Sequence, residues 1–194
     1  MSTPPGEYYT EERWQNWLDR IEEEEVDPED EDSARLLLNL QDDTAIAVAK
    51  ILTDFEDEAL DEEETLDELA GVREIVLDDI EIDDEETVML IDGVQTSLLC
   101  VFYAAEEFVA EGPTSDATIT DYIDAAAEAE ADEDLDAALG YCVQAGTQII
   151  DGSELPMEVV EGLEYGLVSE WVNGLDSLQT AMSDPEVVEE EDES

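Results

Sequence analysis

Apolar residues recur every three or four positions along most of the chain, which is the period of an α-helix. The longest regular stripe, over residues 33–55, predicts a long helix with Ser33 as its N-cap. A second long helix is predicted over 85–111, with Asp83 or Asp84 as its cap. The second half of that segment is apolar almost all round, which is typical of a helix in the middle of a bundle.

Two shorter helices are predicted in the same half of the chain. Thr10 can cap a first helix that reaches about Glu25, and the segment 26–32, with Pro28, separates it from the long helix that follows. An acidic stretch then leads into a helix over about 66–77. Three acids interrupt the best candidate for a strand, at 76–82, so we interpret it as a helix end.

The C-terminal part also has a helical pattern. A linker of small and polar residues, 113–120, precedes two helical segments that meet at a tight turn, Asp132 to Asp134. The pair resembles one hairpin of a tetratricopeptide repeat, but a single unit favours an ordinary αα-hairpin. Pro156 suits the first turn of one last helix, predicted to reach about Met182.

These patterns predict an all-α protein. We expect a compact bundle of about six or seven helices, with two long central helices, a C-terminal αα-hairpin and a last helix. A single domain is predicted over residues 10–182, and a subdivision near 112–120 stays open. Residues 1–9 are predicted to be flexible, and 183–194 to be a disordered acidic tail.

The charge of the chain indicates the solvent in which the protein works more than it indicates the fold. The chain has 60 Asp and Glu against five Lys and Arg, for a formal net charge of −55. Acidic chains are often disordered, but here 43% of residues are hydrophobic and fall at helical spacing. Repulsion among carboxylates is largely screened at about 1 M salt, where the screening length is roughly 3 Å. We therefore expect a cytoplasmic protein of a salt-accumulating halophile, with loosely bound hydrated K⁺ or Na⁺.

Other features limit the location and partners. The N-terminus lacks a basic start followed by an apolar segment, so we expect no secretory signal. The longest apolar run, Leu98 to Ala105, is shorter than the roughly 20 residues that span a bilayer. Phosphates repel an acidic surface, so neither membrane nor direct nucleic-acid binding is expected. Cys100 and Cys142 lie in apolar segments and are interpreted as small buried residues, with a disulfide or reactive thiol as the alternative.

No recognisable catalytic motif occurs in the chain. It has no His, and it lacks a phosphate loop, a dinucleotide glycine pattern and a nucleophile elbow. The acidic loops lack the glycine that a calcium-binding EF-hand loop requires. Glu106 and Glu107 could do acid–base work if buried, but abundance favours a solvated face. We assign no catalytic residue, cofactor or metal ligand.

Two surfaces stand out as candidates for contact with a partner. Trp14 and Trp17 lie on the first helix with Arg13 and Arg20 beside them, either as core residues or as a docking surface. The predicted last helix carries glycines, which cost about 1 kcal/mol each relative to Ala and therefore suggest a close helix approach. Gly162 and Gly166 form a small-xxx-small pair there, facing either an internal helix or a second subunit.

Three runs of the chain are recognisable as a family pattern. They are YYTEERWQNWLDRI, VDPEDEDSARLLLNLQDD and LIDGVQTSLLCVFYAAEEFV. Over about residues 7–111 the chain resembles the haloarchaeal form of an archaeal family of unknown function, domain of unknown function 2150. The resemblance implies a halophilic archaeal origin but no activity, substrate or catalytic residue.

The sequence therefore predicts a non-enzymatic helical protein that acts through protein–protein contact or self-association, as a homodimer or with another protein. One alternative is a nucleic-acid mimic whose carboxylates imitate phosphates and occupy a basic protein. Another is a small-molecule enzyme without a recognisable motif.

Overall fold

Eight α-helices form the described part of the protein, which in this computed structural model comprises residues 9–27 and 29–183. No strand occurs within those ranges. The helices are α1 (Glu11–Glu23), α2 (Glu31–Glu56), α3 (Glu62–Val76), α4 (Glu85–Glu111), α5 (Ile119–Ala131), α6 (Leu135–Ile150), α7 (Met157–Glu161) and α8 (Leu167–Ser183). The all-α prediction is confirmed. The predicted flexible segment and tail lie, apart from Tyr9 and Ser183, outside the described residues, as does Pro28.

Carboxylates and hydroxyls set most helix starts. Thr10 accepts a hydrogen bond from the amide of Arg13, as predicted, and Asp84 accepts one from the amide of Thr87. The predicted N-cap of α2 is wrong. Asp30 caps that helix, and Ser33 is buried and accepts a hydrogen bond from the amide of Asp27 instead.

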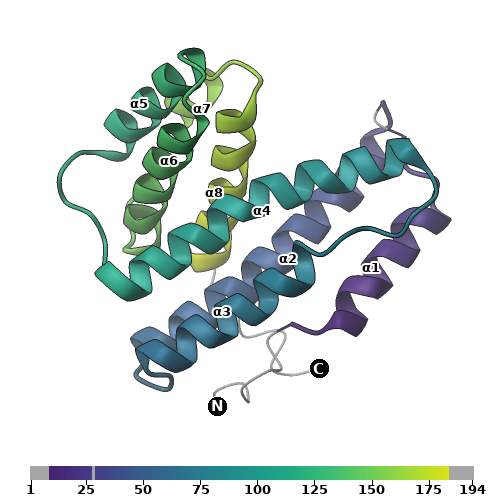
Figure 1. The fold of residues 1–194 in the computed structure, drawn as a ribbon, viewed down its shortest axis with the longest axis horizontal. Coiled ribbons are helices and arrows are strands. Elements are labelled where there is room, and N and C mark those ends of the chain that lie inside the picture. The colour runs from purple at the N-terminus through teal and green to yellow at the C-terminus, as the bar shows by residue number, and fades with distance from the viewer. Residues whose placement is uncertain (1–8, 28, 184–194) are drawn as a thin grey trace.

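Helix α4 lies at the centre of the molecule and joins its two halves (Figure 1). It contacts α2 and α3 on one side and α6 and α8 on the other. By length and composition alone, α4 could also cross a membrane. The buried central helix of a bundle meets the same criterion, and half of the most apolar stretch of α4 is buried inside the fold.

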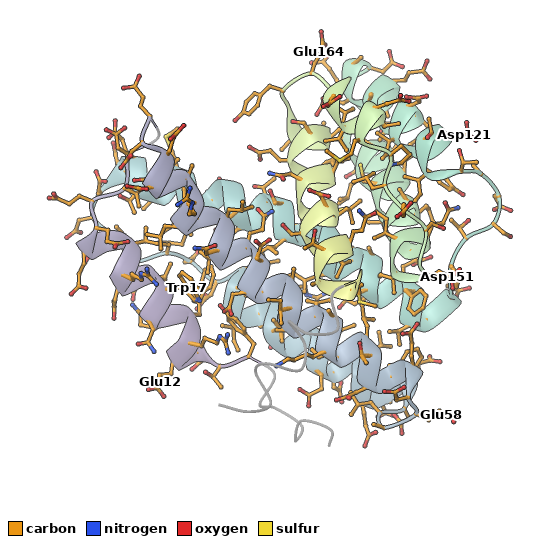
Figure 2. All side chains as sticks on the ribbon, turned by 180° about the vertical axis from the view of Figure 1, so that it is seen from behind. Glu12, Trp17, Glu58, Asp121, Asp151 and Glu164 are labelled. Carbon is orange, nitrogen blue, oxygen red and sulfur yellow. The ribbon has the colours of Figure 1, made fainter. Side chains whose placement is uncertain are left out.

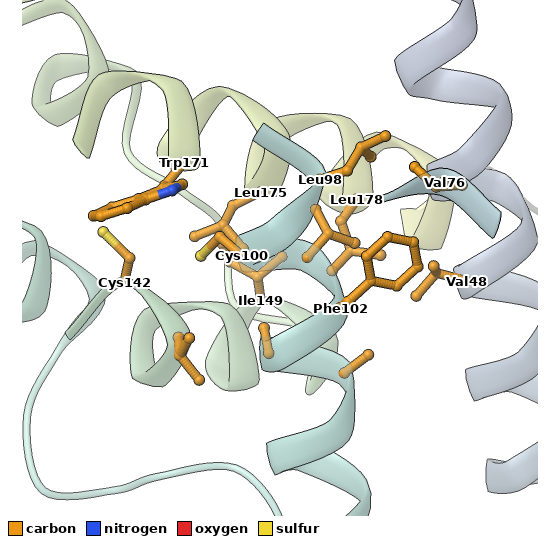
Figure 3. Close-up of a cluster of buried hydrophobic side chains, with 14 of the residues drawn as sticks. Val48, Val76, Leu98, Cys100, Phe102, Cys142, Ile149, Trp171, Leu175 and Leu178 are labelled. Atoms are coloured by element: carbon orange, nitrogen blue, oxygen red, sulfur yellow. The ribbon is translucent and has the colours of Figure 1, made fainter. Parts of the chain in front are cut away.

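One cluster of buried apolar side chains extends through both halves. Figure 3 shows part of it, where Val48 of α2 and Leu178 of α8 lie near Phe102 of α4. The 112–120 linker joins α4 to α5, while the cluster continues past it. Tyr9, placed by the sequence in a flexible segment, is 4% exposed and belongs to this core.

The predicted αα-hairpin is present as α5 and α6, which pack along each other. Thr118 and Asp121 cap α5 reciprocally, and Asp134 accepts a hydrogen bond from the amide of Ala137 at the start of α6. The chain reverses at Glu133, whose φ of 63° lies in the left-handed region.

The prediction of a single last helix is wrong. The chain leaves helical geometry after the short α7 and resumes it only at Leu167. Glu130, at the end of α5, stabilises this new start, because its carboxylate accepts a hydrogen bond from the amide of Val168 at 2.9 Å. At the break the chain lacks helical hydrogen bonds, and the hydrogen bond from the Val168 amide to Glu130 links α8 to α5.

Candidate functional site

The aromatic and basic residues of α1 are used largely inside the molecule. Asp43 of α2 accepts hydrogen bonds from the indole Nε1 of Trp17 at 3.0 Å and from the guanidinium of Arg13. Trp14 is 6% exposed and lies in the core. Arg20 is exposed and lies 5.7 Å from the ring centre of Trp17. The sequence did not single out Asp43, which is the acceptor that organises this cluster.

The predicted glycine pair does not lie on one helix. Gly162 ends α7, and Gly166 lies in the loop before α8. A side chain at Gly166 would collide with the carboxylate of Glu130, since a Cβ there would be 2.7 Å from Oε1. The premise of a small-xxx-small helix face is therefore wrong, and the close neighbour of Gly166 is a side chain of the same molecule, which would have to shift to admit a larger residue.

The close helix approach occurs at Gly174 instead. A Cβ there would lie 2.7 Å from the carbonyl carbon of Ser97 on α4, and closer still to its oxygen. Gly174 therefore lets α8 cross directly over the backbone of α4. The partner of this glycine is internal.

Among the described residues, the pKa values of three carboxyl groups are raised from their ordinary values. Burial raises the pKa of Glu106, against the opposing effect of Arg73, whose Nη1 donates to both carboxylate oxygens at 2.6 and 2.7 Å. Burial also raises the pKa of Asp42, with Asp176 adding to the rise, and that of Glu56. Glu106 is thus not on a fully solvated face, and its partner is a base rather than Glu107.

Both cysteines are buried and free, as the sequence predicted. Figure 3 shows them among Trp171, Leu175 and Ile149. Burial raises the pKa of the Cys100 thiol, so it stays protonated. Within residues 9–27 and 29–183, no group of three Cys, Asp or Glu side chains is arranged as metal ligands.

Acidic side chains cover much of the outer surface, as Figure 2 shows, but one groove differs. It has a volume of about 710 Å³ and lies between α2, α4, α8 and the loop before α8. Leu38, Met89 and Tyr165 line it and are 46%, 73% and 91% exposed. We call this region the α2–α4–α8 groove.

The polar groups of the groove make contacts within the chain. The hydroxyls of Ser97 and Ser169 donate to the carbonyl oxygens of Gly93 and Gly166. The Tyr165 hydroxyl donates to the Glu170 carboxylate at 3.4 Å. The two serine hydroxyls thus donate to carbonyl oxygens and not to a general base, whereas the tyrosine hydroxyl is paired with a carboxylate at a long distance.

Sequence reasoning missed this groove because three distant segments build it. The run Leu36 to Leu38 does indicate an exposed apolar residue. Three consecutive residues of a helix point in different directions, so one buried face cannot take up all three leucines. Leu36 is in the core, whereas Leu38 remains outside. Met89 gives a similar signal within the predicted central helix.

No curated protein and no solved structure matches the chain. The model of a family described as an uncharacterised protein conserved in archaea, DUF2150, matches residues 7–191. That match extends beyond residues 7–111, over which the sequence resembles this family, and includes the αα-hairpin and the last helix. The chain therefore belongs to this archaeal family, DUF2150.

Proposed function

We propose that the protein acts by binding another protein through the α2–α4–α8 groove and has no catalytic activity of its own. The groove is the observation that supports this proposal. Exposed apolar residues gathered in one groove often mark a site of interaction, and Met and Tyr are enriched where proteins meet. Because the chain has 60 acidic residues, an apolar region on its surface contrasts with its surroundings and supports a binding role.

The test is affinity capture from lysate of the native organism, at native salt. The bait is compared with a groove variant, Met89→Gln with Tyr165→Ser, and with a matched control, Met157→Gln with Tyr141→Ser. Met157 and Tyr141 are also exposed, at 59% and 39%, but do not line the groove. We expect a partner that the wild-type and control baits retain and the groove variant loses.

Other results would favour a different function or a different contact surface. A partner retained equally by all three baits, and released steeply by salt, would favour the nucleic-acid mimic. A partner lost only on Trp17→Ala or Arg20→Ala would place the contact at α1, where the sequence predicts a docking surface. If the wild-type bait retains no protein above bare resin, the binding function is wrong.

We also propose that the protein works in the concentrated salt of a haloarchaeal cytoplasm, with hydrated K⁺ or Na⁺ loosely associated with its carboxylates. The net charge of −55 supports this, because screening at about 1 M salt removes most of the repulsion between carboxylates that are not in contact.

A further inference from the structure

We propose that the occupant of the α2–α4–α8 groove is a helical segment of another protein with an apolar stripe flanked by Lys or Arg. This inference rests on the binding function proposed above and adds the chemistry of the partner. It depends on two observations, the apolar lining and the charges around it.

The lining is nearly free of charge. Among the described residues that line the groove, Glu170 is the only charged one, although almost a third of the chain is acidic. Leu38, Met89 and Tyr165 come from three different segments and leave apolar atoms in water. An amphipathic helix that lays its apolar face into such a groove covers these atoms, with anchors spaced three and four residues apart.

The surroundings of the groove are acidic. Asp42 follows the lining residue Gln41 in the chain, and Asp176 lies about one helical turn after the lining residue Asn173. Exposed Glu164 precedes the lining residue Tyr165 and lies at an outer edge of the molecule (Figure 2). These carboxylates, together with Glu170, would meet the flanks of a bound segment.

One base lies near the groove. Arg35 follows the lining residue Ala34, but it lines a different pocket together with Arg20. The rim therefore keeps an excess of negative charge. Complementary bases on the partner would gain from ion pairs in direct contact with these acids, because concentrated salt screens separated charges more than partly buried pairs.

Charge also argues against a second copy as the occupant. The chain has no base after Arg73, so a second copy would bring mainly further carboxylates to the rim. A partner helix with Lys or Arg on either side of its apolar stripe would instead place positive charges against the acids around the groove.

The experiment is a selection of phage-displayed random peptides of about 16 residues, a length that gives about four helical turns. Selection uses the wild-type protein, at a KCl concentration where circular dichroism shows it folded. We expect enriched peptides to pair apolar residues at helical spacing with flanking Lys or Arg. The groove variant should weaken their binding at least about tenfold, as loss of interface anchors does. The Met157→Gln, Tyr141→Ser control should bind as wild type.

Several outcomes would overturn the inference. They are enriched peptides without an excess of Lys or Arg, equal binding to the groove variant, unchanged binding when the flanking bases are replaced by Glu, or no enrichment at all. The native partner separates this inference from the proposed function. If lysate capture yields a protein that depends on Met89 and Tyr165 but docks through an acidic or uncharged segment, the function stands and the chemistry proposed here is wrong.

Discussion

At the scale of single residues, glycine at position 174 has a role that a sequence pattern cannot reveal. Helical spacing showed three glycines near the C-terminus, each a candidate for close approach. Only the backbone of Ser97 on α4 distinguishes Gly174, which needs the space for a helix crossing, from Gly162, which ends a short helix. The requirement depends on a residue 77 positions earlier in the chain, so local propensity contains no sign of it.

We expect Gly174→Ala to lower the free energy of unfolding by about 1–3 kcal/mol or more, because the added methyl group forces α8 away from α4. Chemical denaturation followed by circular dichroism measures this change. Gly140→Ala is the matched control. It lies exposed in α6 with nothing near its Cβ position, and there alanine should stabilise by up to about 1 kcal/mol. Equal effects at the two sites would contradict the close crossing.

At the scale of elements, α1 depends on a small number of contacts with the rest of the bundle. It packs against α2 and α3 through the face that carries Trp14, Leu18 and Ile21. Asp43 adds the polar contact, since it accepts from both Trp17 and Arg13. In the sequence, Asp43 is one of 60 acids, and only the packing of α1 on α2 gives it this role.

We expect Asp43→Ala to destabilise the protein by about 1–3 kcal/mol and to loosen α1 first, because the indole N–H and the guanidinium lose their shared acceptor. Hydrogen exchange resolved by helix checks this, with the largest loss of protection in Glu11–Glu23. Asp19→Ala, an exposed acid on α1 itself, should change stability by no more than about 0.5 kcal/mol. Uniform loss of protection in all helices would argue against a local anchor.

The break between α7 and α8 shows where helical periodicity fails as a predictor. Val159, Val160, Leu163 and Leu167 continue the spacing of a single helix across a segment that is not helical. Glu130 contributes from a distance in sequence, because its carboxylate is placed by α5 and accepts a hydrogen bond at the new start. By contrast, the bounds of α4 and the tight turn at Glu133 follow from local signals and were predicted correctly.

At the scale of the whole molecule, the acids and the apolar core act in opposite directions. The core cluster reaches through both halves, while 60 carboxylates favour an expanded chain at low salt. Composition and periodicity together predict this arrangement, in which acidic residues surround an apolar helical core. They could not predict the groove, since its walls meet only in three dimensions.

We expect the midpoint of thermal unfolding and the helical content to rise with KCl, most steeply between about 0.1 M and about 1 M. Over that range the screening length falls from about 10 Å to about 3 Å, so repulsion between separated carboxylates fades. Far-ultraviolet circular dichroism measures both quantities, and sucrose serves as a non-ionic control. Helicity that persists unchanged down to millimolar KCl would contradict the proposed adaptation to salt.

The construction of the α2–α4–α8 groove also has a consequence for the order of events during protein synthesis. Its walls include residues as far apart as Ala34 and Asn173, so a ribosome-bound chain that ends before α8 has no complete groove. The amide of Val168 in the first turn of α8 donates to Glu130, which links the start of that helix to α5. The groove is therefore complete only once α8 has been synthesised, and a partner that needed all of its walls would bind finished chains but not chains truncated before α8.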